Sequence, residues 1–163
     1  MKIIGVAWIG FAIPFRRPYL AANTQALVRY GLLTFLRAES GVVGVGEASP
    51  VGVGRRQEIE NAATLLERLA PQMLQADLTA LGGLFLPPAQ DIPPFIRFGL
   101  ETALLDMEGK AHGCPVAKLL GSVPAQLVVN ALVTAEAPRE AVSQVKEAVA
   151  QGFTSIKLKV AQG

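Results

Sequence analysis

The chain has 163 residues, of which 51% are hydrophobic and 17% are charged, and its formal net charge is +2. A chain of this length and apolar content can bury a sizeable core, which argues against intrinsic disorder. Its small charge, without a dense run of lysine and arginine, argues against a nucleic-acid partner. The single cysteine, Cys114, cannot form an internal disulfide, which fits a reducing compartment.

Residues 2–13 are expected to form a strand, and residues 14–26, rich in proline and small polar residues, a loop. Two further strands follow, joined by a tight turn at residues 39–41. The first 50 residues therefore predict a three-stranded antiparallel meander, followed by a glycine-rich loop at residues 51–54. The glycines from Gly41 onward lack the spacing of a nucleotide-binding loop, so we interpret them as part of the closing strand.

From Arg55 the apolar residues recur at helical spacing, and Pro71 inside this pattern predicts a kink or a restart. Residues 77–94 are expected to form a short helix and a loop. A second, largely buried helix is expected from Pro94, with Gly113 as its cap and Pro115 preventing its continuation. Its expected core positions are Phe95, Phe98, Ala103, Leu104, Leu105 and Met107. One or two more helical turns follow.

The acidic residues of this second helix could be mistaken for a metal cluster. Glu101 and Glu108 share one helix face, but Asp106 lies off it. We interpret all three as surface carboxylates and expect no metal ligands in the chain. His112, the only histidine, is expected to act as a polar cap at the end of the helix.

After Pro124 the pattern changes to strand, helix and strand. Gln126–Val133 is a nearly continuous apolar run, typical of a parallel strand that is covered on both faces. A helix ending at Gly152 and a second strand, Thr154–Val160, complete a βαβ unit. The chain is therefore expected to divide into an α+β domain, 1–122, and the start of a larger βα domain, 123–163.

Two lysines share one face of the last strand, because residues two apart in a strand point the same way. Lys157 and Lys159 lie on one face, and Ile156, Leu158 and Val160 lie on the other. A plain solvent-exposed face is one interpretation. The βαβ context favours another, since in a closed βα barrel this face lines the mouth where active sites lie. Ammonium groups about 6–7 Å apart disfavour each other's charge, which makes a neutral lysine base available.

The chain resembles the N-terminal part of the enolase superfamily, specifically its muconate-lactonising subgroup. Five stretches carry the resemblance: IPFRRPY at 13–19, VRYGLLTFL at 28–36, GVVGVGEASPVGVG at 41–54, FGLETALLDMEGKAHGCPVAKLLG at 98–121 and GFTSIKLKV at 152–160. The helix at 98–113 and VVNALV at 128–133 are most similar to the o-succinylbenzoate synthases, the dehydratases (carbon–oxygen lyases) of menaquinone biosynthesis. Dipeptide epimerases, N-acylamino acid racemases and muconate cycloisomerases share the same frame and stay open as alternatives.

The resemblance implies a capping domain that closes over a TIM-type barrel, and a small-molecule carboxylate substrate bound to Mg²⁺. It implies that Lys159 removes the proton α to the carboxylate and that Lys157 supports it electrostatically; in the synthases dehydration follows. It also implies two cap loops over the substrate, matching residues 20–26 and 50–54. Leu20, Asn23, Val51 and Gly52 are the candidate substrate contacts.

The chain departs from this pattern in length. A TIM barrel takes about 250 residues, far more than follow Pro124. The carboxylates that hold the metal in the superfamily, and the lysine on the opposite side of the barrel, have no counterpart here. We expect a fragment of a longer enzyme, inactive alone, that self-associates or associates with the missing barrel portion. A non-catalytic folding or interaction module is the alternative.

The N-terminal apolar run is not expected to be a signal peptide. Gly5, Gly10 and Pro14 interrupt it, and two arginines follow where a cleavage site would be needed. No stretch offers about 18 uninterrupted apolar residues for a transmembrane helix. These features predict a cytoplasmic protein without a membrane partner.

Overall fold

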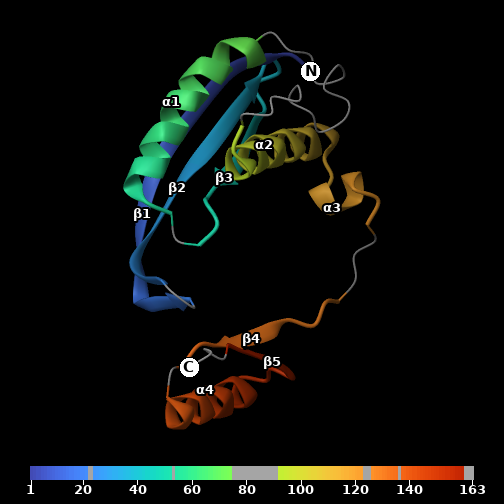
Figure 1. Ribbon diagram of the computed structural model, residues 1–163. Coiled ribbons are helices and arrows are strands. Elements are labelled where there is room, and N and C mark those ends of the chain that lie inside the picture. Colours follow the sequence, from blue (N-terminus) through green and yellow to red (C-terminus); the bar gives the residue numbers. More distant parts are fainter. Residues whose placement is uncertain (22–23, 53, 75–91, 123–125, 136, 160–163) are drawn as a thin grey trace. The chain divides into compact units, whose positions relative to one another are not determined.

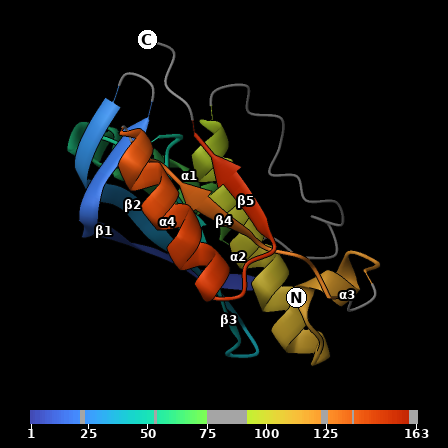
Figure 2. The same ribbon diagram turned by 90° about the horizontal axis from the view of Figure 1, so that it is seen from below.

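The computed structural model describes residues 1–21, 24–52, 54–74, 92–122, 126–135 and 137–159, and Figures 1 and 2 label its elements in chain order. By its contacts the chain divides into two units. The first contains Met1–Arg17 and Ala26–Val123, and the second contains Pro18–Gln25 and Pro124–Gly163. Each unit is described by itself. None of the described helices is long and apolar enough to span a membrane.

Three strands form the sheet: β1 (Ile3–Ala21), β2 (Thr24–Ala38) and β3 (Val43–Ala48), in the order β1-β2-β3. β2 and β3 are antiparallel, with Thr34 opposite Gly46. The turn between them includes Gly41, whose φ of 87° suits a residue without a side chain. The predicted meander is therefore confirmed.

The predicted loop at residues 14–26 is wrong. β1 continues to Ala21, and β2 already begins at Thr24, so only residues 22 and 23 separate two long strands. β1 is an edge strand of the sheet. In an edge strand, a proline need not remove a hydrogen bond between strands, so β1 can contain Pro14 and Pro18.

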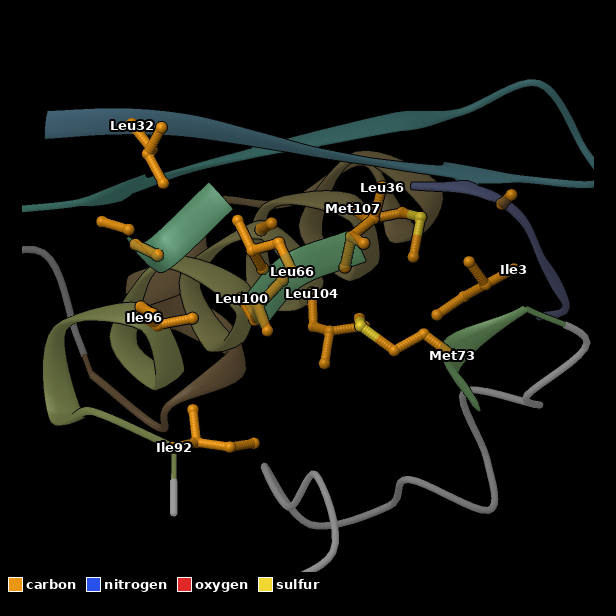
Figure 3. Packing of buried hydrophobic residues seen from close by; sticks show 14 of the residues in the cluster. Ile3, Leu32, Leu36, Leu66, Met73, Ile92, Ile96, Leu100, Leu104 and Met107 are labelled. Atoms are coloured by element: carbon orange, nitrogen blue, oxygen red, sulfur yellow. The ribbon is translucent and has the colours of Figure 1, made fainter. Parts of the chain in front are cut away.

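Two helices, α1 (Arg56–Met73) and α2 (Pro94–His112), pack their apolar side chains against the sheet. Figure 3 shows the strands on one side and the helices on the other, with buried side chains such as Leu36, Leu66 and Leu100 between them. The cluster consists of Ile3, Leu32, Leu36, Ala38, Ala48, Ile59, Ala62, Leu66, Met73, Ile92, Ile96, Leu100, Ala103, Leu104 and Met107. These residues form the core of the first unit.

The helix ends follow local signals, with one exception. Gly113 caps α2 in the left-handed conformation at φ 63°, as predicted, and α3 (Val116–Leu119) follows Pro115. The predicted restart at Pro71 is wrong, because α1 continues through it as one helix. Pro71 lies in the last turn, so its missing N–H costs a single bond near the helix end. The predicted helix and loop at 77–91 lie outside the described residues.

Phe98 is not a core residue of the first unit, contrary to the prediction. Its side chain is 61% exposed, whereas Leu100 and Met107 of the same helix are fully buried. α2 is covered on the face that lies on the sheet, and Phe98 lies off that face. The prediction of a largely buried helix holds for the face on the sheet but not for Phe98.

Glycines let α2 approach the backbone of β3. Along β3 the buried positions are Gly44, Gly46 and Ala48. A methyl group at Gly44 would overlap the carbonyl oxygen of Ala103, and one at Gly46 would overlap that of Gly99. The glycine-rich run is thus a strand, as interpreted, and its glycines serve close helix–sheet packing.

Side chains of α2 also occupy backbone groups of β3. The Val45 N–H donates a hydrogen bond to the Asp106 carboxylate at 2.8 Å. The Lys110 ammonium donates to the carbonyl of Val43 at 2.9 Å and to Asp106 at 2.6 Å. Because these backbone groups bond to α2, they are not available to another strand.

The Asp106 carboxylate is stabilised in its charged form. Partial burial by itself would raise its pKa, but the hydrogen bonds from Lys110 and Val45 and the charge of Lys110 outweigh this and lower the pKa. A lowered carboxylate pKa contributes stability above the unfolded-state pKa of about 3.9. That contribution is lost as the pH falls through the still lower folded-state pKa.

Asp106→Ala is expected to lower the free energy of unfolding of the first unit at pH 7 by about 1 kcal/mol, since the hydrogen bond from the Val45 N–H to the carboxylate is removed. The loss should shrink as the pH falls below about 4. Urea unfolding at pH 7 and at a pH below about 4 measures this loss of stability. The fluorescence of Trp8, which packs against the core, reports the unfolding. Glu108→Ala, at an exposed position of the same helix, is the control. Equal stability of the two variants at pH 7 would contradict the proposed role of Asp106.

The second unit contains the predicted βαβ. β4 (Asn130–Val133) and β5 (Ser155–Leu158) form a parallel pair with Ala131 opposite Ile156, and α4 (Pro138–Ala150) connects them. Gly152 follows the helix at φ 91°, as expected of a stop. The strand predicted for Gln126–Val133 is shorter than expected, because β5 provides only four partners. Leu127, Val128 and Val129 are 72–86% exposed, so the prediction of cover on both faces is wrong for the described residues.

Candidate active site

The two lysines lie at the end of β5. Lys157 is within the strand and pairs with Leu132 of β4. Lys159 follows the strand, but its backbone N–H still donates to the carbonyl oxygen of Val133 at 2.9 Å. The parallel pairing thus extends one residue past β5. It holds the backbone of both lysines beside β4.

The lysine face of the parallel pair is open, whereas the other face is covered by α4. α4 packs against the β4–β5 pair (Figure 2). Val133 is 1% exposed and Ile156 is half-buried, and the pairing register puts both on the face opposite Lys157. On the lysine face Leu132 is 52% exposed, and both lysine side chains are exposed. Along β5 the predicted alternation is incomplete, because Ser155 and Ile156 are both half-buried and Lys157 and Leu158 are both exposed. Leu158, expected to be packed, is 49% exposed, and Val160 lies outside the described residues.

This arrangement presents two amines on one accessible face. Within the described parts of the chain, neither Lys157 nor Lys159 has an ion-pair or hydrogen-bond partner for its side chain. An ammonium group with free donors can attract a carboxylate, and a neutral amine can accept a proton from carbon. The pair could therefore bind an anionic substrate and transfer a proton.

The second group of candidate residues lies in the loop between β3 and α1. Val51 is fully exposed, and Gly52 has a φ of 83°, which a side chain would disfavour. The guanidinium of Arg29, on β2, donates a hydrogen bond to the carbonyl of Gly52. No sequence pattern indicated Arg29, because a contact between residues 23 positions apart leaves no local signal.

Of the other proposed substrate contacts, Leu20 lies in β1 rather than in a loop, and Asn23 lies outside the described residues. Leu20 belongs to the second unit and Val51 to the first. The structure brings Lys157 and Lys159 together on one face, and it places Val51 and Gly52 side by side in their loop.

Among the described residues, no group of three or more histidine, cysteine, aspartate or glutamate side chains could hold a metal ion. Asp106 is occupied by Val45 and Lys110. The described residues therefore do not fit the Mg²⁺ that the resemblance implies.

Comparison with known proteins places the chain in a family. Residues 11–121 match the family model described as mandelate racemase / muconate lactonizing enzyme, N-terminal domain. An aromatic dipeptide epimerase of Herpetosiphon aurantiacus is 28% identical over 91% of this chain and 42% of its own length. Muconate cycloisomerase 1 of Pseudomonas putida is 37% identical over 61% of this chain and 27% of its own.

The fold agrees with a solved structure of the same kind. A dipeptide epimerase from Methylococcus capsulatus, complexed with Mg and the dipeptide L-Arg-D-Lys, has a TM-score of 0.82 and 25% identity. The match covers 99% of this chain and 46% of that one. The chain spans less than half the length of the relatives it matches, so it contains a capping domain of antiparallel strands and helices and only part of a βα barrel.

These matches confirm the resemblance to the muconate-lactonising subgroup but lend no support to o-succinylbenzoate synthase in particular. The matched residues include the meander, its glycine-rich strand and the helix that packs on it. The chain belongs to the mandelate racemase / muconate lactonizing enzyme family of the enolase superfamily, as its N-terminal part.

Proposed function

We propose that the whole protein carrying this chain abstracts the proton α to a carboxylate and epimerises a dipeptide, with Lys159 as the base. The observation that supports this proposal is the open lysine face at the end of β5, where both amines are exposed beside a parallel partner strand. Enzymes of the enolase superfamily are the relatives that share this part of the chain. Capping domain 1–122 and barrel portion 123–163 are the proposed domains.

The chemistry assigned to this chain is a proton transfer. The neutral Lys159 amine takes the α-proton, and the electron pair of the broken C–H bond moves into the carboxylate to form an enediolate. The Lys157 ammonium stabilises the negative charge that develops. Return of a proton to the opposite face, from an acid elsewhere in the whole protein, inverts the configuration. The described residues form no magnesium site, so the ligands of a metal-dependent enzyme would come from the rest of the protein.

Dipeptides are favoured as substrates because the aromatic dipeptide epimerase aligns with 91% of the chain. The sequence preference for dehydration to o-succinylbenzoate rests on two short stretches and gains nothing from the relatives above. Cycloisomerisation is a second candidate, since muconate cycloisomerase 1 has the higher identity of 37%, although over a shorter alignment. Leu20, Asn23, Val51 and Gly52 remain proposed substrate contacts.

A panel of substrates tests this proposal. The whole natural protein would be incubated in D₂O with Mg²⁺ and, separately, aromatic dipeptides, cis,cis-muconate and the o-succinylbenzoate precursor. Proton NMR is expected to show loss of the dipeptide α-proton signal and appearance of the epimer. Dehydration of the precursor with inert dipeptides would overturn the proposed substrate class. Absence of α-proton exchange in every substrate would overturn the proposed reaction.

A further inference from the structure

The loop between β3 and α1, described at Ser49–Gly52 and Gly54–Arg55, runs back along β2. Ser49 lies against Gly31, where a methyl group would meet its hydroxyl oxygen. A methyl group at Gly54 would lie 3.1 Å from the carbonyl oxygen of Tyr30. The described parts of the loop therefore lie beside residues 29–31 of β2.

Arg29, on β2, contacts the loop at Gly52. Its guanidinium donates to the Gly52 carbonyl, and Gly52 and Gly54 have φ values of 83° and 69°, in the left-handed region that favours glycine. Pro50 is buried at the other end of the turn. Between these fixed points the Val51 side chain projects fully into solvent.

We propose that Arg29 is a positioning residue: it anchors the β3–α1 loop at Gly52 and so sets where Val51 meets the substrate. Arginine suits this task because its planar fork holds a carbonyl in a defined direction, which the flexible ammonium of lysine does not. The anchoring stands on the loop geometry alone. The effect on substrate binding rests on the proposed function.

Amide hydrogen exchange in the β3–α1 loop tests the Arg29–Gly52 anchor without any assay of activity. Arg29→Met is expected to raise amide hydrogen exchange in the peptide covering 49–55, and tryptic cleavage after Arg55, by about tenfold, the scale of one lost hydrogen bond to a charged group. Arg29→Lys should fall between Arg29→Met and the wild type. Arg37→Met is the matched control, since Arg37 lies on the same strand, is exposed, and has its side chain beside Gly5. Exchange in Arg29→Met equal to that in Arg37→Met would overturn the proposal.

Kinetics of the whole protein separates the anchor from the proposed function. With a dipeptide that the wild type epimerises, Arg29→Met is expected to raise KM by about tenfold and to change kcat less than twofold, because the loop contacts the substrate and not the reacting proton. Unchanged KM despite raised loop exchange would refute the substrate part of the inference. Raised loop exchange in a protein without any dipeptide turnover would support the anchor and contradict the proposed function.

Discussion

Lys159→Ala is expected to slow dipeptide epimerisation by the whole protein by about 10²–10⁴-fold, the usual contribution of one general base. The side chain lies on the open face of the β4–β5 pair, and its backbone is held by Val133, so truncation should leave the strand in place. The measurement is the rate of α-proton exchange and of inversion, followed by proton NMR in D₂O.

A substitution that keeps the charge separates a base from an electrostatic role. Lys159→Arg retains a cation but cannot lose its proton near neutral pH, so it is expected to be as slow as Lys159→Ala. Lys157→Ala should lose less, because Lys157 stabilises charge and transfers no proton. Lys146→Ala, at an exposed position of α4, is the control and should keep the wild-type rate.

The stereochemistry of exchange gives a second readout. If Lys159 serves one face of the α-carbon, its loss abolishes exchange for one diastereomer, while the other still exchanges through the base on the opposite face. A merely misfolded variant would lose both. Retention of exchange for both diastereomers in Lys159→Ala would remove Lys159 from the mechanism.

Features set by neighbouring residues could be predicted from the sequence. Pro94 begins α2 and Gly113 ends it, because fixed φ at one end and left-handed φ at the other are local requirements. The placement of Lys157 and Lys159 on one face follows equally from the two-residue period of a strand, although exposure along β5 does not alternate.

Features set by distant contacts could not be predicted. Whether Pro14 interrupts a strand depends on whether that strand lies at an edge of the sheet, which the local composition does not show. The exposure of Phe98 depends on which face of α2 meets the sheet. The bond from Arg29 to Gly52 depends on a loop folding back along β2. In each case the deciding partner lies far away in the sequence.

Gly46→Ala is expected to destabilise the first unit by about 3 kcal/mol or more, the upper range for overpacking, although it adds one methyl group. That methyl would overlap the carbonyl oxygen of Gly99 and would lie 2.6 Å from the hydroxyl oxygen of Thr102, both of which belong to α2. Backbone cannot rotate away as a flexible side chain can, so α2 must shift. The shift would also disturb the hydrogen bond of 2.9 Å that the Thr34 hydroxyl donates to the same Gly99 oxygen.

Gly10→Ala is the matched control for this substitution. Gly10 also lies in a strand, but it is exposed, and its methyl group would meet Leu32 at 3.8 Å and Ile59 at 4.0 Å, which are ordinary contacts. Because alanine restricts the unfolded chain more than glycine, Gly10→Ala should be neutral or stabilise by up to about 1 kcal/mol. Urea unfolding followed by Trp8 fluorescence compares the two, since Trp8 is the only tryptophan and packs on this core. If Gly46→Ala were as stable as Gly10→Ala, close backbone packing could not be the reason for glycine in β3.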